Sequence, residues 1–373
     1  MLINELPIEQ LTARMKEKKE DIRGSYFRDT TAIIHSYPFR RLKHKTQVFF
    51  APSNDHICTR IEHVQHVATI AATICKGLSL DDELAWAIGL GHDLGHAPFG
   101  HVGETVISEL NGEGGGFKHE IYSLRVVDHL AYYGTGLNLT YAVRDGIISH
   151  CGEKFEQVLS PDFVIKDLST IKERIILPST WEGVAVRVAD KIAYLGRDFE
   201  DAVKLKIIDR EEIPKEVLSV LGMTNSEIIN TLVSDVVKTA NVGKGIGFSD
   251  KVFHAVTMLK DFNYKKIYKS HLLADYHTYF ERILKIIHEY LSGLYTKYGD
   301  DWEGYKRERN LLAIRFGNYI KKMQVFYEQV DGNYDHLIID YIVGMSDNYA
   351  LDCINEIITP KYMNEQFNRF LMD

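Results

Sequence analysis

Proline is scarce in this sequence. Only eight of the 373 residues are proline, and none lies between Pro214 and Pro360. Because proline interrupts helices and is confined to the edges of sheets, its absence over so long a stretch permits long helices. Apolar residues recur there at helical spacing, in segments such as SEIINTLVSDVVKTA and YFERILKIIHEYLSGLY. We therefore expect an all-α protein.

Cysteine and long apolar runs are also lacking. The four cysteines are scattered without a CxxC pair, which excludes a zinc ribbon and a disulfide framework and fits a reducing cytosol. No window reaches eighteen uninterrupted apolar residues, and the N-terminus has no basic segment followed by an apolar run. We expect a cytoplasmic protein without a membrane span. The cysteines are Cys58, Cys75, Cys151 and Cys353.

An excess of positive charge is missing too. The formal net charge is -8, which argues against a general polyanion binder but leaves room for a local basic pocket. RRLKHK at residues 40–45 is either such a pocket or a solvated helix face. Repeats, low-complexity linkers and charge blocks are absent. We expect one large helical domain, with a core over residues 1–210 and a helical extension over residues 211–373 that packs on this core.

Histidine and carboxylate side chains are concentrated in one stretch, GLGHDLGHAPFGHVGE, at residues 89–104. The His-Asp pair follows the apolar helical segment ELAWAIGLG, so it is expected at the inner end of a helix. A neighbouring imidazole and carboxylate suit a hard or borderline cation such as Mn, Mg, Fe or Zn. The alternative is a polar helix end. The polar residues of the stretch are His92, Asp93, His96, His101 and Glu104.

Several other segments have helical patterns. We expect a short charged helix at residues 8–20 and a long helix at residues 53–78 whose apolar stripe passes close to His63. A lone histidine in such a place is more often a hydrogen-bonded core residue than a ligand. Residues 117–130 and 140–152 are expected to be helical and contribute His119 and His150, whereas NGEGGG at residues 111–116 predicts a loop near the mouth of the site.

Residues 180–203 predict a helix with one acidic face. Its polar residues recur every three or four positions, which places them along one side, and they are Asp190, Tyr194, Arg197, Asp198 and Asp201. A buried face with three carboxylates needs cations. These are either a metal ion or the side chains of Lys191 and Arg187.

The order of His63, His92-Asp93 and Asp190 resembles the H…HD…D pattern of the HD superfamily of metal-dependent phosphohydrolases. More narrowly, RDTTAIIHSYPFRRLKHKTQVF, TRIEH, GHDLGHAPFGHVGE and DYIVGMSDNYA resemble, in the correct order, motifs of the deoxyguanosine triphosphate triphosphohydrolases. Ala32, where an Arg is common, and Ala97, where a Pro is common, depart from the pattern. Neither departure removes an expected ligand.

The resemblance implies an HD-domain helical fold and a metal site. It makes His63, His92, Asp93 and Asp190 the ligands of a divalent ion. Mn, Mg or Fe is expected, with Zn or Ni as ions retained on purification. Such a ligand set leaves positions open for water and a phosphate oxygen.

The resemblance also assigns His101 and Glu104 to catalysis, with Glu104 fixing the imidazole and His101 as the candidate general acid. The implied reaction is hydrolysis of a deoxynucleoside triphosphate, dGTP or a similar one, to deoxynucleoside and inorganic tripolyphosphate. Seven further residues are implied to contact the phosphates or the sugar. They are Gln47, Arg60, His96, His119, Lys191, Tyr194 and Asp198.

Two alternatives to this function stay open. An HD-family nucleotide phosphatase or phosphodiesterase shares the metal ligands but does not need His101 and Glu104. A nucleotide-binding regulator without turnover is expected to have lost part of the set, and none is lost here. The resemblance also implies a homo-oligomer, a hexamer or tetramer, and allows an effector nucleotide or single-stranded DNA as a partner. Tyrosines in the C-terminal region suggest surface for an oligomer interface, namely Tyr290, Tyr295, Tyr305 and Tyr319.

Overall fold

The computed structural model describes residues 2–19, 21–50, 54–111, 116–152, 155–174 and 176–359. Within these ranges it has sixteen α-helices and a single two-stranded sheet, so the expected all-α class is confirmed. The two strands, β1 (Val158–Leu159) and β2 (Ile246–Gly247), are antiparallel, with Val158 opposite Gly247. Residues 112–115 of the expected glycine-rich loop lie outside the described ranges.

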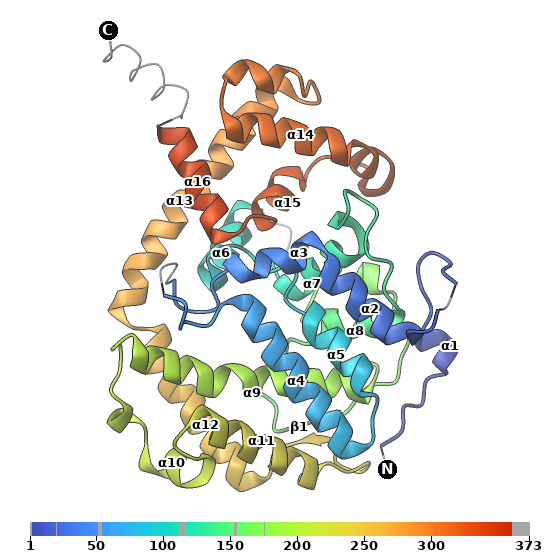
Figure 1. Ribbon diagram of the computed structural model, residues 1–373, viewed down its shortest axis with the longest axis vertical. Helices are drawn as coiled ribbons and strands as arrows, with labels where there is room; N and C mark the ends of the chain where they lie inside the picture. Colours follow the sequence, from blue (N-terminus) through green and yellow to red (C-terminus); the bar gives the residue numbers. More distant parts are fainter. Residues whose placement is uncertain are drawn as a thin grey trace.

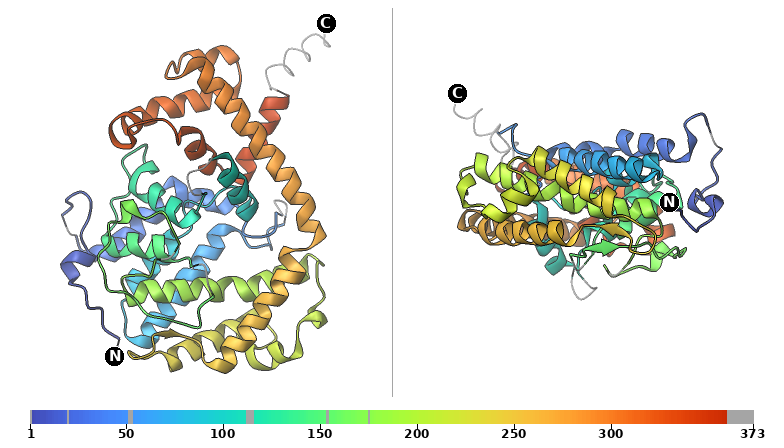
Figure 2. Two further views of the ribbon diagram at one scale, coloured as in Figure 1. Left: turned by 180° about the vertical axis from the view of Figure 1, so that it is seen from behind. Right: turned by 90° about the horizontal axis from the view of Figure 1, so that it is seen from below.

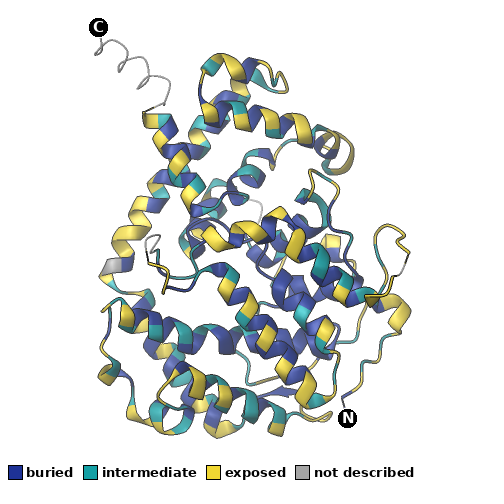
Figure 3. Ribbon diagram, in the orientation of Figure 1, coloured by how far each residue is buried: buried dark blue, intermediate teal, exposed yellow. Residues whose placement is uncertain are grey.

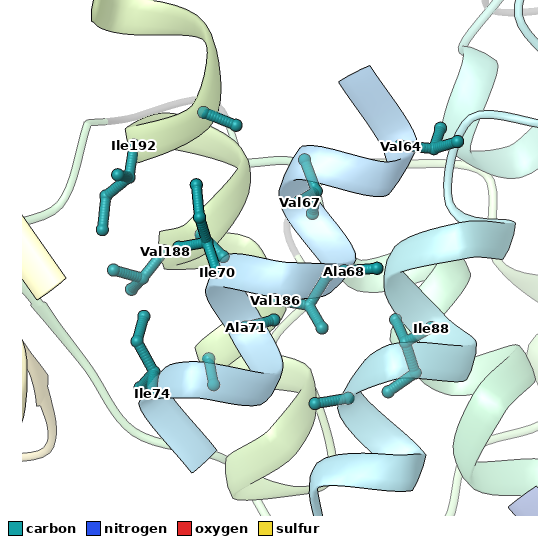
Figure 4. Close-up of a cluster of buried hydrophobic side chains, with 14 of the residues drawn as sticks. Val64, Val67, Ala68, Ile70, Ala71, Ile74, Ile88, Val186, Val188 and Ile192 are labelled. Carbon is teal, nitrogen blue, oxygen red and sulfur yellow. The ribbon is translucent and has the colours of Figure 1, made fainter. Parts of the chain in front are cut away.

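Three helices form the centre of the molecule. Helix α4 lies beside α5 and α9, and their apolar side chains meet in one cluster (Figure 4). Most of the predicted stripe on α4 is fully buried, and each valine or isoleucine in it contributes roughly 1.5–3 kcal/mol by leaving water. The buried members are Val64, Val67, Ala68, Ala71 and Ile74. The bounds are α4 (Arg60–Leu78), α5 (Asp82–Gly91) and α9 (Trp181–Lys204).

Helix α4 begins seven residues later than the apolar pattern suggests. Thr59 is extended and forms an isolated β-bridge with Thr46. The Glu62 carboxylate accepts a hydrogen bond from the Thr59 backbone N–H at 2.7 Å, which satisfies a donor at the helix start. This capping box, rather than hydrophobicity, fixes the first turn.

The remaining helices of the N-terminal part surround this centre (Figure 1). They are α1 (Ile8–Leu11), α2 (Gly24–His35), α3 (Tyr37–Arg41), α6 (Gly100–Leu110), α7 (His119–Arg125) and α8 (Tyr141–Ser149). Short 3₁₀ turns occupy Leu42–His44, Leu168–Thr170, Arg210–Glu212 and Gly304–Glu308, and π turns occupy Val126–Leu130, Tyr264–Tyr268 and Tyr327–Asp331.

The expected helix at residues 8–20 is wrong beyond its first turn. It ends at Leu11, and Arg14 forms a β-bridge with Thr140. The Arg14 guanidinium lies 2.5 Å from the buried carboxylate of Asp29. A long-range ion pair therefore holds this segment extended, and a local pattern does not reveal such a partner.

The C-terminal half divides between two hydrophobic cores. Helices α10 to α12 pack under α9 and share the first core, which reaches as far as Leu273. Helix α13 then runs along one edge of the molecule to a second group of helices (Figures 1 and 2). The bounds are α10 (Lys215–Leu221), α11 (Asn225–Thr239), α12 (Asp250–Asn263), α13 (His271–Tyr298), α14 (Leu311–Phe326), α15 (Leu337–Val343) and α16 (Asp347–Ile358).

The second core also includes residues from the stretch at 89–104. Ala97 and Phe99 pack with side chains of α13 to α16, and Val106, two residues beyond the stretch, joins them. Phe99 stacks on Phe280 of α13 with ring centroids 4.2 Å apart. The C-terminal helices thereby fix the position of α6, and the expected division at residue 210 stays a prediction.

The interpretation of the C-terminal tyrosines as open surface is wrong. Tyr305 is fully buried in the second core, and the other three are half-buried against it. Polar partners make this burial possible, because Tyr305 Oη donates to the Gly299 carbonyl at 2.8 Å and Tyr319 Oη lies 3.2 Å from Tyr327 Oη. Figure 3 shows the buried and exposed faces of these helices.

Among the described residues, each helix is either too short or too polar to cross a lipid bilayer.

Candidate functional site

His92 lies at the C-terminal end of α5, where its ring is held by the preceding turn. Its Nδ1 lies 2.7 Å from the carbonyl oxygen of Gly89, so Nδ1 carries the proton and donates it. Nε2 is then an acceptor, and it is buried without a hydrogen-bond partner. Burial lowers the pKa of His92 to about 4. The imidazole is therefore neutral and points a lone pair into the protein, which is the form that binds metal ions.

The four expected ligands meet at this lone pair. Asp190 Oδ1 lies 3.0 Å from His63 Nε2 and 3.9 Å from His92 Nε2. Asp93 Oδ2 lies 3.7 Å from His92 Nε2 and 3.9 Å from His63 Nε2. Three separate elements, α4, the end of α5 and α9, supply these atoms. Two imidazoles and two carboxylates around an unpaired nitrogen fit a divalent cation.

Both carboxylates are held in the charged form. Burial opposes the charge of Asp93, but Arg60 and the surrounding imidazoles keep its pKa well below the usual range. Burial likewise opposes the charge of Asp190, but the hydrogen bond with His63 keeps its pKa below the usual range. The pocket therefore has two negative charges for a cation.

Arg60, expected to contact substrate, pairs with the carboxylate of Asp93. Its Nη1 forms a short ion pair with Asp93 Oδ2, and both side chains are buried. Its Nε donates to the Thr46 carbonyl at 3.3 Å. Arg60 thereby orients Asp93 from the side of the N-terminal segment. Gln47, next to Thr46, has a buried Oε1 without a hydrogen-bond partner.

The chain reverses sharply between α5 and α6, and glycine makes this possible. A Cβ on Gly95 would lie 2.2 Å from the backbone nitrogen of Ser123, so only glycine lets this turn approach α7. Phe99 and Gly100 have φ values of 63° and 62°, and this left-handed pair redirects the chain into α6. The reversal brings α6 beside the metal-ligand cluster.

Glu104 on α6 joins two histidines. Its Oε2 lies 2.9 Å from His101 Nδ1, and its Oε1 lies 2.5 Å from His119 Nδ1. The expected contact between His101 and Glu104 is thus present, and the contact with His119 is additional. The ring of His96 stacks on that of His119 with centroids 4.8 Å apart.

His101 lies at the edge of the pocket rather than within it. Its side chain is 78% exposed, whereas those of Glu104 and His119 are 11% and 10% exposed. The ring centroid of His101 is 5.7 Å from that of His96. His101 belongs to the first turn of α6, at the solvent-exposed side of this cluster.

His150 and Cys151 reach the same pocket, although the sequence reasoning assigned them no role. Cys151 Sγ lies 3.3 Å from both His119 Nε2 and His150 Nε2. Burial alone raises the pKa of Cys151, but the two imidazoles lower it to about 7. One sequence signal was available, because His150-Cys151 ends an apolar helix in the same way as His92-Asp93.

Arg187 and Lys191 do not neutralise the acidic face of α9, where Asp201 pairs with Lys204 at 3.5 Å. Arg187 and Lys191 both pair with Glu156, at 2.5 Å and 2.6 Å. The interpretation that these two bases neutralise this face is therefore wrong, and Lys191 is turned toward Glu156. Tyr268 Oη donates to Asp198 Oδ2 at 2.5 Å, and burial raises the pKa of Asp198 to about 7.

Tyr194 completes the α9 residues expected to contact substrate. It is half-buried against the first core, one turn beyond Asp190. Burial, with Asp190 and Asp198 nearby, raises its pKa above the usual range. The phenol is therefore neutral and able to donate a hydrogen bond.

The basic segment at residues 40–45 has one buried lysine and two exposed arginines that lie in different places. Lys45 is buried, and its Nζ donates to the carbonyl oxygens of His96 and Val343. It is thus a structural tie between the turn after α5 and the C-terminal helices. Arg40 and Arg41 are exposed and line a separate cavity of about 660 Å³ next to α14.

Comparison with known proteins agrees with this geometry. The HD domain family matches residues 60–195, the range that contains all four expected ligands. Deoxyguanosinetriphosphate triphosphohydrolase-like proteins are similar over nearly the whole chain. The protein from Caldanaerobacter subterraneus is 36% identical over 354 residues, covering 94% of this chain and 90% of its own.

Two further relatives carry the same name. The protein from Desulfatibacillum aliphaticivorans is 37% identical over 345 residues, covering 92% of this chain and 90% of its own. The one from Rickettsia felis is 27% identical over 397 residues, covering 96% and 98%. This chain contains an HD domain and belongs to the family of deoxyguanosinetriphosphate triphosphohydrolase-like proteins.

Proposed function

We propose that the chain hydrolyses a deoxynucleoside triphosphate, dGTP or a similar one, to deoxynucleoside and inorganic tripolyphosphate. The observation that carries this proposal is the buried, unpartnered His92 Nε2 among three further ligands, with a His101–Glu104 pair on the next helix. The relatives' printed name supplies the substrate class.

His63, His92, Asp93 and Asp190 would hold a divalent ion, with Mn, Mg or Fe as the ions that this ligand set favours. Such an ion supplies neutralisation of phosphate charge and a nucleophile near neutral pH. The protein's own contribution is to bury these ligands, to keep the His92 imidazole neutral and to fix Asp93 through Arg60.

The reaction breaks the bond between the 5′ oxygen and the α-phosphorus. The oxygen of water enters the tripolyphosphate, and the 5′ oxygen must gain a proton because an alkoxide is a poor leaving group. His101 is the proposed proton donor. Its Nδ1 is bound by Glu104, so Nε2 is the nitrogen proposed to donate the proton.

The remaining residues would position the substrate. His96 and His119 lie beside the ligand cluster and are proposed to face the phosphates. Tyr194 and Asp198, one and two turns beyond Asp190, are proposed for the phosphate and sugar. Gln47, Arg60 and Lys191 are weaker proposals, since Arg60 and Lys191 already have protein partners.

Product analysis tests the function. The metal-loaded protein is incubated with dGTP, the other deoxynucleoside triphosphates, deoxynucleoside monophosphates and cyclic nucleotides, and phosphorus NMR identifies the products. Tripolyphosphate in equal amount to deoxynucleoside is expected. Orthophosphate from monophosphates, or opened cyclic nucleotides, would favour the phosphatase or phosphodiesterase, and binding without turnover would favour the regulator.

A further inference from the structure

Three ligand atoms beside the HD cluster form a nearly equilateral triangle. His119 Nε2 lies 3.2 Å from His150 Nε2, and Cys151 Sγ lies 3.3 Å from each nitrogen. A tetrahedral zinc ion, bound at about 2.0–2.1 Å to nitrogen and about 2.3 Å to sulfur, separates its ligand atoms by about 3.3–3.6 Å. The three atoms are thus spaced like one face of a tetrahedral metal site.

The protons on the two imidazoles are directed away from this triangle. His150 Nδ1 lies 2.7 Å from the Ile147 carbonyl oxygen, which can only accept, so that nitrogen carries a proton. His119 Nδ1 lies 2.5 Å from the Glu104 carboxylate, which also accepts. Because each Nδ1 already has a partner outside the triangle, the Nε2 atom of each ring is the one left to face Cys151 Sγ, and the two Nε2 atoms lie 3.2 Å apart.

A fourth ligand is available from the HD pair. Asp93 Oδ2 faces His63 and His92, whereas Asp93 Oδ1 lies 3.7 Å from His119 Nε2. One carboxylate thus presents an oxygen to each of two adjacent sites. Carboxylates shared in this way are suited to pairs of metal ions about 3.5–4 Å apart.

The hydrogen bonds that orient the two imidazoles are of the kind found around metal-binding histidines. His150 follows α8 and bonds the carbonyl three residues earlier, as His92 does after α5. The Glu104 carboxylate behind His119 forms the carboxylate–histidine arrangement that orients metal-binding imidazoles. His119 and His150 are both buried.

We propose that His119, His150 and Cys151, with Asp93 as a shared carboxylate, bind a second divalent ion next to the HD site. A thiolate and two imidazoles select a borderline ion such as Zn²⁺ over Mg²⁺ or Mn²⁺. His119 would bind this ion through Nε2, and the ion would mediate the phosphate contact that is proposed above for His119. The ion would add positive charge where the proposed function places the triphosphate, but the site itself does not depend on that function.

Cobalt is the probe, because Co²⁺ replaces Zn²⁺ and shows a charge-transfer absorption when a thiolate binds it. The full-length protein is stripped of metal under reducing conditions and titrated with Co²⁺. Two ions per chain and the thiolate band are expected. Cys151→Ser and Cys151→Ala should each lose the band and bind one ion fewer while keeping the wild-type circular dichroism.

Two control variants separate the sites. Cys353→Ala, in the second hydrophobic core, should keep both ions and the band. Asp190→Ala should lose the HD ion and keep the band, because Asp190 is no ligand of the second site. One Co²⁺ per chain without a thiolate band in the wild type would overturn the second site, as would a band that survives both Cys151 substitutions. Loss of dGTP turnover alone would bear on the proposed function and leave these readouts unchanged.

Discussion

His101 is the residue at which a triphosphohydrolase should differ from a simple metal-binding HD protein. It contacts Glu104 but is no ligand of the metal cluster. His101→Ala should therefore keep its metal and bind dGTP while losing turnover by roughly 10²- to 10⁴-fold, as expected for a lost general acid. Steady-state kinetics and metal analysis on the same preparation measure both quantities.

Glu104→Gln serves as the matched variant. The amide keeps the shape of the side chain, so a smaller loss of turnover than in His101→Ala is expected. The wild-type pH profile should contain an ionisation that His101→Ala lacks. Wild-type turnover in His101→Ala, or a loss explained by missing metal, would contradict the proposed role.

Asp198 gives a pH dependence of stability whose sign is fixed by its surroundings. Burial raises the pKa of Asp198 to about 7 in the folded protein, above an unfolded value of about 4. Between these values the folded state holds a proton that the unfolded state has lost. The contribution of Asp198 to the free energy of unfolding therefore falls as pH rises through this window, by at most about 4 kcal/mol.

Asp198→Asn removes this titration. Urea unfolding of the metal-free wild type and variant from pH 5 to pH 8 should show the variant gaining stability relative to the wild type up to about pH 7, and a constant difference above it. A difference that does not change with pH would show that Asp198 ionises normally in the folded chain.

At the scale of elements, the close packing of α5 on α4 positions His92. A Cβ on Gly89 would lie 2.6 Å from Cα of Ala68, so Gly89→Ala must push the two helices apart. We expect a loss of about 1–3 kcal/mol in the free energy of unfolding, together with weaker metal binding. Chemical denaturation and metal titration measure the two effects.

Gly293→Ala on α13 is the control. An added Cβ there meets no atom within 4 Å, so the variant should be as stable as the wild type or more so by roughly 0.5–1 kcal/mol. Equal unfolding midpoints for the two variants would contradict the packing argument.

The helices that sequence predicts well are those whose apolar stripe faces the core. The stripe on α4 and the spacing along α9 reveal both helices, and the order of ligand types reveals which residues converge. The helix predicted after Leu11 is wrong because the structure of this segment depends on the ion pair between Arg14 and Asp29. Periodicity reports local burial and contains no information on such distant partners.

The same limit applies to the site. His150 and Cys151 are thirty residues beyond His119 in sequence, and only the packing of α7 on α8 brings the three side chains together. The exposure of His101 also depends on the left-handed turn at Phe99, which spacing alone does not predict. Residue types identify the candidates, and the fold decides which of them touch.

At the scale of the whole molecule, the C-terminal helices pack against the turn between α5 and α6 that carries part of the site. The second core includes Phe99. Lys45 donates hydrogen bonds both to the turn after α5 and to Val343, the last residue of α15. Residues 211–273 belong to the first core. Composition and charge gave no sign of this arrangement, because both halves are equally helical and apolar.

The oligomeric state of the chain stays a prediction, and one exposed helix face suggests where the interface lies. The buried Tyr305 no longer supports an oligomer, but α13 presents Tyr279 and Ile286, which are 52% and 39% exposed and lie about two turns apart. Large exposed apolar side chains on one helix face are typical of interaction surfaces. Family resemblance and this face together predict a hexamer or tetramer.

Light scattering at micromolar concentration should give a mass of four or six chains. If α13 forms the interface, Tyr279→Arg combined with Ile286→Arg should lower that mass, because two buried charges without partners disfavour association. Gly293→Ala on the same helix should leave it unchanged. A wild-type mass of one chain would refute the oligomer. An unchanged mass in the double variant would place the interface elsewhere, because two arginines on a face that stays in water hardly change the free energy of association.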